Sequence, residues 1–341
     1  MLDSVNLIIY GAAVSAISFF GVLFMTPAAI RSLTAKRKVV PDAHKPEKPQ
    51  VPRPAGPVIM ISIAAAEIVL FFLTMNIAVF AILLTTAIAF LVGYIDDSRR
   101  VMPGWFKPVA LLAAAIPLVV LDIYGVGEVH GDSLNLIFGS AHIPLLYIPF
   151  IFIIIPITGN TINSIDVLNG VASGFLIIAT IPLLASIAIF GSREVFLAAL
   201  PILFATIAFY RYHKFPSRIF PGDSGTLLLG AMYGAVAIAG SSEIIGVIAL
   251  LPAVMNSFLF LASVKRIIEH REVKARPTIL TDDFKLAAST DSTAPATLVR
   301  LIVVDRPLGE RETGYQIFKL ATFTALLAFA SIAIQYIVVL R

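Results

Sequence analysis

Ten long apolar segments dominate this chain of 341 residues and restrict it to one class of fold. Hydrophobic residues make up 58% of the chain and charged residues only 13%, which is more apolar surface than a water-soluble core of this size can bury. A helix needs about 20 apolar residues to cross about 30 Å of hydrocarbon. We therefore expect an all-α polytopic membrane protein with about ten transmembrane helices. The expected spans cover approximately residues 5–30, 57–73, 77–94, 108–122, 143–158, 168–190, 195–212, 226–240, 244–264 and 316–339.

The segments between the spans are too short for a second folded unit. The largest polar segment, at about 265–315, lies between the last two spans, so we expect residues 1–341 to form a single integral-membrane domain. The start of the chain, MLDSVNLIIYG, lacks a basic segment and a small-residue cleavage site, and we expect the first apolar run to be a retained span.

The positive charges fall almost entirely on one side of this arrangement. Lys and Arg lie in the loops after the first, third, seventh and ninth spans, and these loops hold 23 of the 25 basic residues. Only Arg193 and Arg341 fall on the other side. Because short basic loops stay in the cytoplasm, this asymmetry predicts that both termini lie on the non-cytoplasmic side.

The unusual polar clusters also fall on the predicted cytoplasmic ends of the spans. The loop after the first span carries Asp42, Lys45 and Arg53, followed by Pro-Ala-Gly, and taken alone it is typical of a solvated basic loop. The third span ends with Asp96 and Asp97. Adjacent carboxylates repel one another and oppose the helix dipole at a C-terminus, so we expect a cation partner. Pairing with Arg99, Arg100 or Lys107 would satisfy them without any further role.

A third cluster is the sequence GNTINSIDVLNG at residues 159–170. Asn160, Asn163, Asp166 and Asn169 recur every three residues, a spacing that a broken or 3₁₀ segment aligns better than a regular α-helix. Irregular backbone at membrane depth is tolerated where it lines a cavity. Hydrogen bonding between helices is the alternative.

Two more clusters complete the set. The loop FPSRIFPGDSG at 215–225 places Arg218 and Asp223 between two apolar runs, and a charged loop in that position is costly unless it has a function; a short turn with a capping Asp is the alternative. The sequence KRIIEHREVKARP at 265–277 contains His270 and Arg271. Such a basic run suits either lipid headgroups or a diphosphate.

Together these clusters place Asp and Asn oxygens beside a basic rim. Oxygen ligands without His or Cys clusters suit Mg²⁺ or Mn²⁺, and the chain has no Cys. A metal with Arg and Lys groups at a membrane surface indicates phosphoryl transfer involving a lipid. The absence of a GxxxxGK[ST] motif argues against an ATPase, and nothing in the chain points to a nucleic-acid partner.

At this point the chain resembles a known family. GYIDDSRR, NTINSIDVLNG, FPSRIFPGDSG and the His270–Arg271 loop resemble, in order, the motifs of the polyprenyl-phosphate N-acetylhexosamine-1-phosphate transferases. PSRIFPGDSG and TLVRLIVVDRPLGERE are most similar to the eukaryotic and archaeal branch, the UDP-GlcNAc–dolichyl-phosphate GlcNAc-phosphotransferases. The chain departs from the DGLDG string of the bacterial relatives at residues 166–170, and its ninth loop has one His where those relatives have several.

The resemblance implies a cytosolic active site and transfer of GlcNAc-1-phosphate, or of a related N-acetylhexosamine-1-phosphate, from the UDP-sugar to a polyprenyl or dolichyl phosphate, with release of UMP. It implies Mg²⁺, for which Mn²⁺ could substitute. By motif position, Asp223 and Asn163 are the metal ligands, and Asp96, Asp97 and Lys107 lie near the lipid phosphate. The implied substrate-binding residues are Lys45, Asn160, Asp166, Asn169, Arg218, His270 and Arg271.

The chemistry itself favours direct attack. A phosphate monoester has a second pKa of about 6, so the lipid phosphate needs little help from a base, and repulsion between two dianions is the larger obstacle. The competing mechanism is an aspartyl-phosphate intermediate on Asp97. Two other classes remain as alternatives: a transporter or flippase for a lipid-linked or anionic substrate, and an intramembrane aspartyl protease. The expected membrane is the plasma membrane of a prokaryote, an archaeon in particular, with the endoplasmic reticulum as the alternative, and a homodimer is expected from the resemblance.

Overall fold

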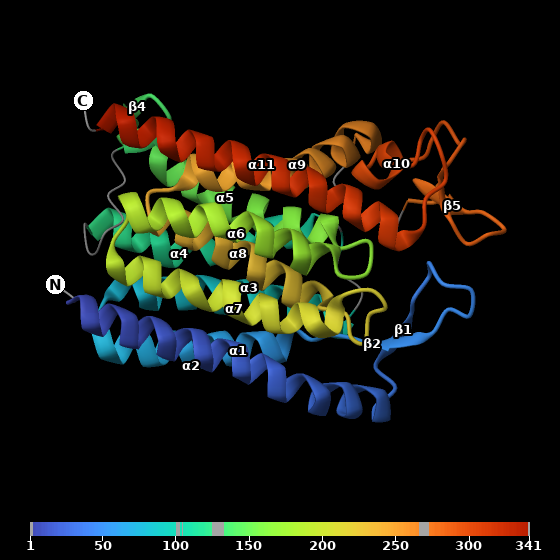
Figure 1. The fold of residues 1–341 in the computed structure, drawn as a ribbon, viewed down its shortest axis with the longest axis horizontal. Coiled ribbons are helices and arrows are strands. Elements are labelled where there is room, and N and C mark those ends of the chain that lie inside the picture. Colours follow the sequence, from blue (N-terminus) through green and yellow to red (C-terminus); the bar gives the residue numbers. More distant parts are fainter. Residues whose placement is uncertain (1–2, 100–102, 104, 125–132, 266–272, 340–341) are drawn as a thin grey trace.

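In a computed structural model of the chain, the described residues form ten long helices that pack into one bundle (Figure 1). The structure describes residues 3–99, 103, 105–124, 133–265 and 273–339. The long helices are α1 (Ser4–Ala35), α2 (Gly56–Thr74), α3 (Ile77–Arg99), α4 (Phe106–Tyr124), α5 (Pro144–Ile165), α6 (Val171–Phe190), α7 (Arg193–His213), α8 (Gly222–Ala239), α9 (Glu243–Val264) and α11 (Glu310–Val339).

The helices confirm the predicted class of an integral, polytopic membrane protein. Among the described residues, nine of these helices are long and apolar enough to cross a membrane. The exception is α8, which has 18 residues and carries Asp223 in its first turn. All ten predicted spans correspond to helices.

Several helices run further than the apolar runs predict. Helix α1 continues to Ala35, α3 continues through Asp96 and Asp97, and α5 continues to Ile165. Helix α11 begins at Glu310, six residues before the predicted start at 316. The extensions of α3, α5 and α11 carry polar residues that contact other segments, so hydropathy alone makes these helices too short.

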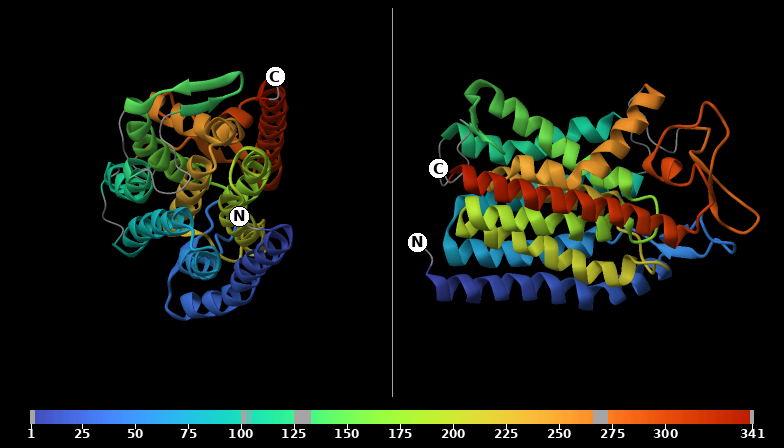
Figure 2. Two further views of the ribbon diagram at one scale, coloured as in Figure 1. Left: turned by 90° about the vertical axis from the view of Figure 1, so that its left-hand side faces the viewer. Right: turned by 45° about the horizontal axis from the view of Figure 1, so that its top comes forward.

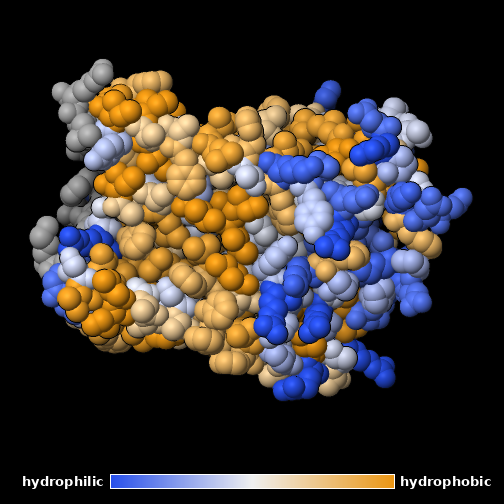
Figure 3. Space-filling view, viewed as in Figure 1, coloured by the Kyte–Doolittle hydropathy of each residue, from blue (hydrophilic) through white to orange (hydrophobic). Residues whose placement is uncertain are grey.

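The bundle has one strongly polar end. In Figure 1 the first residues of α1 and the last residues of α11 lie together at the left, and the loops that follow α1 and α9 lie at the right. Figure 3 shows hydrophilic residues gathered mainly at the right-hand end and a broad hydrophobic band across the middle of that face. In the right view of Figure 2 the helices run roughly parallel between these two ends, and in the left view most of them are seen nearly end-on. Which end faces the cytoplasm stays a prediction from the charge distribution.

Short hairpins and one small helix were not predicted. The strands pair as β1 (Val39–Pro41) with β2 (Gln50–Pro52), β3 (Ser133–Leu136) with β4 (Gly139–His142), and β5 (Thr278–Leu280) with β6 (Leu286–Ala288). All three pairs are antiparallel. Helix α10 (Leu298–Ile302) follows the third hairpin. The first and third hairpins lie in the loops of the polar end.

Helix α8 forms the centre of the bundle. Every residue of α8 except Asp223 is buried. The helix packs against α2, α3 and α5, with further contacts to α4, α6, α7 and α9. Because α8 is enclosed, its small and apolar residues meet other helices, and its first turn opens at the polar end. This arrangement makes Asp223 the point where the core of the bundle meets the polar loops.

Candidate active site at the start of α8

Three carboxylates and two cations meet at the first turn of α8. We call Asp96, Asp97, Asp223, Lys107 and Arg53 the carboxylate cluster. The Nζ of Lys107 lies 3.0 Å from Oδ2 of Asp96 and also contacts Oδ2 of Asp223. The Nη2 of Arg53 lies 2.9 Å from Oδ1 of both Asp97 and Asp223. Four segments of the chain therefore meet here, and the cluster keeps one negative charge in excess when all its groups are ionised.

Asp97 secures the start of α8. Its Oδ1 accepts a hydrogen bond from the backbone N–H of Asp223 (3.1 Å), and its Oδ2 accepts from the N–H of Ser224 (2.9 Å) and from the Ser224 hydroxyl (2.6 Å). The residue before the helix, Pro221, offers no side-chain cap. The first N–H groups of a helix need acceptors and favour a negative charge, and Asp97 supplies both from a different helix.

Two glycines allow this close approach. A side chain at Gly93, one turn before Asp97 on α3, would come within 2.4 Å of the Asp223 carbonyl oxygen. Gly222 has φ of +72°, and a Cβ there would lie 2.4 Å from Pro54 and 2.7 Å from Oδ2 of Asp97. Only glycine adopts that backbone conformation without strain in so little space. Glycine at positions 93 and 222 thus allows α3 to contact the start of α8.

Asn163 reaches the same turn from α5. Its Oδ1 accepts a hydrogen bond from the hydroxyl of Thr226 (2.7 Å), and this hydroxyl lies 3.4 Å from the Asp223 carbonyl oxygen. The structure therefore brings the two predicted metal ligands, Asn163 and Asp223, to one turn of α8. A carboxylate and a carboxamide oxygen are hard ligands of the kind that Mg²⁺ takes. Two cationic side chains, Arg53 and Lys107, already lie against Asp223 and neutralise its charge.

Arg53 is the residue that the sequence analysis missed. Taken alone, its loop predicted a solvated basic segment, yet the structure places its guanidinium between Asp97 and Asp223 with 32% of the side chain exposed. Burial alone would lower the pKa of Arg53, but the carboxylates of Asp223, Asp97 and Asp166 outweigh that effect and raise it. The signal was the sequence Pro52-Arg53-Pro54 directly before an apolar run, which fixes the arginine at the mouth of a helix.

The Asn and Asp series after residue 159 is divided between a helix and a turn. Helix α5 is regular to Ile165, so the expected broken or 3₁₀ segment is wrong for residues 159–165. Asn160 donates to the Pro156 carbonyl of its own helix (2.8 Å). Asp166, just past the helix, lies 3.4 Å from Nε2 of His213. Burial raises the pKa of Asp166 to about 7, although nearby Arg53 acts in the opposite direction.

Asn169 belongs to a second cluster, which we call the loop latch and define as Asp42, Lys45, Asn169 and Glu310. The Asn169 Oδ1 accepts from Lys45 (2.9 Å) and from the N–H of Ser217 (2.6 Å), and its Nδ2 donates to Asp42 (3.1 Å). Its backbone N–H donates to Glu310 (2.8 Å). The Lys45 ammonium contacts Asp42 and lies 3.5 Å from Glu310.

The loop latch joins four separate segments of the polar end. They are the β1–β2 hairpin, the turn between α5 and α6, the loop before α8, and the start of α11. The predicted substrate-binding residues Lys45 and Asn169 therefore contact one another, which the sequence did not indicate. Glu310 is a further residue that the sequence analysis did not single out.

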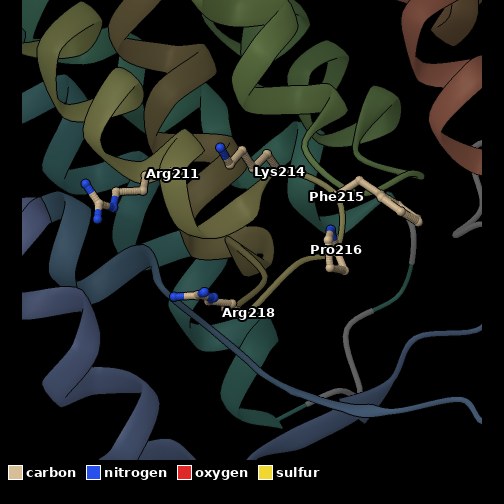
Figure 4. A pocket seen from close by; sticks show the side chains of 5 residues that line it. All are labelled: Arg211, Lys214, Phe215, Pro216 and Arg218. Atoms are coloured by element: carbon tan, nitrogen blue, oxygen red, sulfur yellow. The ribbon is translucent and has the colours of Figure 1, made fainter.

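Arg218 lines a pocket of about 620 Å³ together with Asp42 and Lys45 of the loop latch. It also lines a pocket of about 370 Å³ with Arg211, Lys214, Phe215 and Pro216, at the end of α7 and in the loop that follows (Figure 4). Its backbone N–H donates to the Tyr212 carbonyl (2.8 Å), and its side chain is exposed. The predicted site residues His270 and Arg271 lie outside the described residues.

A larger cleft opens beside the turn after α5. It has a volume of about 530 Å³, and its lining includes Ser164, Val167, Asn256, Phe260 and Arg276. Asn256 also joins two segments that line the cleft. Its side chain donates to the Ser164 carbonyl (3.1 Å) and accepts from the N–H of Leu298 (2.9 Å). The cleft lies within the range of sizes of ligand pockets.

Comparison with known proteins places this geometry in context. The model of glycosyl transferase family 4 matches residues 79–241. A protein of Saccharolobus solfataricus named "Putative UDP-N-acetylglucosamine--dolichyl-phosphate N-acetylglucosaminephosphotransferase" is 31% identical over 236 residues, which cover 66% of this chain and 69% of that protein. A phospho-N-acetylmuramoyl-pentapeptide-transferase of Staphylococcus haemolyticus is 28% identical over 219 residues, 61% of this chain and 68% of that protein.

An archaeal protein of Methanocaldococcus jannaschii, named "Putative glycosyltransferase", is 29% identical over 247 residues, 72% of each chain. The stretch that matches the family model contains every member of the carboxylate cluster except Arg53, and it contains Asn163. The loop latch is only partly inside it, because Asp42, Lys45 and Glu310 lie beyond its limits.

Proposed function

Because this chain belongs to glycosyl transferase family 4, a family of polyprenyl-phosphate sugar-1-phosphate transferases, we propose that its own reaction is transfer of N-acetylglucosamine-1-phosphate from UDP-GlcNAc to dolichyl phosphate. The observation that carries the proposal is the meeting of Asp223, Asn163, Arg53 and Lys107 at the polar end of a membrane bundle. Oxygen ligands for a divalent cation and fixed cations for phosphates are the parts that phosphoryl transfer requires. The name of the Saccharolobus relative supports this donor and acceptor.

The roles that we propose for these residues follow the exposure of their side chains. Asp223, with 14% of its side chain exposed, and Asn163 would hold the divalent cation, Mg²⁺ in the first place and Mn²⁺ as a substitute. When bound, that cation supplies positive charge beside the donor diphosphate. Lys107, with 4% of its side chain exposed, keeps Asp223 and Asp96 oriented. The predicted contact of Lys107, Asp96 and Asp97 with the lipid phosphate stays a prediction.

The cleft beside α5 is a suitable place for the donor. Its lining offers apolar walls and Arg276, whose guanidinium suits a phosphate. The turn that carries Asp166 and Asn169 begins at its edge, since Val167 and Leu168 line it. We place the nucleotide part of the donor here, with the diphosphate directed toward Asp223. Contacts of Asn160, Arg218, His270 and Arg271 with substrate remain predictions.

The proposed chemistry is a direct displacement. An oxygen of the lipid phosphate attacks the β-phosphorus of the donor, the bond from that phosphorus to the bridging oxygen breaks, and UMP leaves with that oxygen. Asp97 is a poor nucleophile in this site because its side chain is 2% exposed and both oxygens already accept hydrogen bonds. To attack phosphorus it would have to release the start of α8. These contacts favour direct attack over an aspartyl-phosphate intermediate.

The decisive assay offers the purified protein UDP-GlcNAc, other UDP-sugars, dolichyl phosphate and undecaprenyl phosphate, with UMP release as the readout. Magnesium-dependent release with UDP-GlcNAc and dolichyl phosphate is expected. Release only with another UDP-sugar would correct the donor, and no release with any pair would refute the transferase. Exchange of labelled UMP into UDP-GlcNAc without lipid would favour the two-step mechanism.

We also propose that the polar end faces the cytoplasm of an archaeal cell and that the protein resides in its plasma membrane. The support is the basic composition of the loops at that end and the archaeal source of two relatives. A homodimer stays a prediction. A cysteine placed at Lys48, in the β1–β2 loop, should react with a membrane-impermeant maleimide only after cells are opened; labelling of intact cells would reverse the orientation.

A further inference from the structure

Asp223 is held by two cations that differ in how they are fixed. Lys107 contacts Oδ2 of Asp223, also binds Asp96, and has a side chain that is 4% exposed. Arg53 contacts Oδ1 of Asp223 and has a side chain that is 32% exposed. A buried ammonium between two carboxylates is costly to move. A partly exposed guanidinium can leave one partner and stay solvated.

The contacts of Arg53 also provide it with a second position. The same nitrogen, Nη2, lies 2.9 Å from Oδ1 of Asp97 and 2.9 Å from Oδ1 of Asp223. If Asp223 is taken by another cation, Arg53 keeps its ion pair with Asp97. Asp97 is itself immobile because it holds the first turn of α8.

The backbone of Arg53 is fixed, so only its side chain is free to move. Its N–H donates to the Lys38 carbonyl (3.1 Å), and it stands between Pro52 and Pro54. Two residues further on, the backbone N–H of Ala55 donates to the carbonyl of Phe220 (3.0 Å), in the loop that leads into α8. The guanidinium therefore moves about a fixed point beside the site.

From these contacts we propose that Arg53 and the divalent cation compete for the same oxygen of Asp223, and that Arg53 turns to the donor diphosphate when the cation arrives. The inference rests on the proposed function and adds a role for a residue that lies outside the stretch matched to the family model. Arg53 thus neutralises Asp223 while the site is free of substrate. The incoming diphosphate then provides the guanidinium with a better, bidentate partner than a shared carboxylate oxygen.

The competition is tested with Mn²⁺ alone, without donor or lipid. Binding of Mn²⁺ to the purified protein in nanodiscs is measured by electron paramagnetic resonance for the wild type, Arg53→Ala and Arg53→Lys. Removal of the competing guanidinium should tighten Mn²⁺ binding by about tenfold in Arg53→Ala, and Arg53→Lys should fall between the two. The matched control is Arg211→Ala, which removes one positive charge from an exposed residue of α7 and should change binding by less than about twofold.

The outcomes separate this proposal from the proposed function. Unchanged or weaker Mn²⁺ binding in Arg53→Ala overturns the competition, and so does an equal gain in Arg211→Ala, which would reflect net charge alone. Absence of Mn²⁺ binding in every form overturns the cation site itself and the competition with it. Thermal unfolding of each variant shows whether it is folded, and Arg53→Lys keeps the test valid if Arg53→Ala is not.

Discussion

The carboxylate cluster and the loop latch lie at the same end of the bundle, and each has one more carboxylate than cations, yet they differ in how their cations are held. The carboxylate cluster has three carboxylates for two cations, and one of those cations is partly exposed. The loop latch has two carboxylates around one ammonium, and Asn169 hydrogen-bonds to Lys45, Asp42 and Glu310. A partly exposed guanidinium shared by two carboxylates can give way to a metal, whereas an asparagine that hydrogen-bonds to both an ammonium and a carboxylate suits the joining of loops.

The comparison predicts the largest loss of activity at Asp223. Asp223→Asn removes the charge that would hold the divalent cation, and we expect the rate of UMP release to fall on the order of a thousandfold. The matched control is Asp283→Asn, because Asp283 is exposed in the β5–β6 hairpin and its side chain is 76% accessible. Wild-type rates in Asp223→Asn would remove the carboxylate cluster from the mechanism.

Lys107 should have the largest effect on stability. Lys107→Met leaves Asp96 and Asp223 without the ammonium between them, and loss of one partner of a buried ion pair costs about 3–5 kcal/mol. The free energy of unfolding in detergent measures this loss. A second change, Asp96→Asn, should restore part of it, since one of the two facing charges is then gone. Additive losses in the double variant would contradict the pairing.

Asn169 tests the other side of the comparison. Asn169→Ala removes hydrogen bonds to Asp42, Lys45 and the Ser217 N–H, two of them to charged groups, and should lower the free energy of unfolding by about 2 kcal/mol. If Asn169 only joins loops, the rate of UMP release at saturating donor should stay within about fivefold of wild type. A much larger loss of rate in a protein that remains stable would show that Asn169 contacts the substrate and does not only join loops.

The smallest effect on activity is expected at the opposite end of the bundle. There the Tyr147 hydroxyl donates to the buried carboxyl of Glu243 at 2.6 Å, joining α5 to α9. Tyr147→Phe should cost about 1–2 kcal/mol of unfolding free energy and leave UMP release unchanged. A fall in the rate of UMP release with unaltered stability would show that the contact between Tyr147 and Glu243 influences the reaction.

The sequence predicted the helices better than it predicted their partners. Apolar runs locate each span because burial in lipid requires them, but α3 and α5 extend beyond those runs because Asp97 and Asn163 are satisfied by groups of α8 that lie more than 60 residues away. The count of spans predicted that Asp97, Asn163 and Asp223 lie at the same end of the bundle, and the structure has them there. Counting spans cannot distinguish a carboxylate that binds a substrate or metal from one that caps a helix. It therefore did not show that Asp97 accepts hydrogen bonds from the first turn of α8.

Arg53 and Asn169 illustrate why the partners of polar side chains could not be predicted from the sequence. An arginine in a polar loop and an asparagine near a span end are both common at a membrane surface, and their local sequence fixes neither direction nor partner. Only the structure shows that Arg53 pairs with Asp97 and Asp223 and that Asn169 hydrogen-bonds to Asp42 and Glu310. Such contacts depend on how four separate segments converge, which a single sequence does not specify.

The enclosure of α8 has a consequence for how the protein responds to its surroundings. Other helices separate α8 from the acyl chains, so changes in bilayer thickness or lateral pressure act first on peripheral helices such as α1 and α11. The position of Asp223 is set by protein contacts on every side of its helix. Lipid composition should therefore govern the supply of the acceptor more than the shape of the reaction centre.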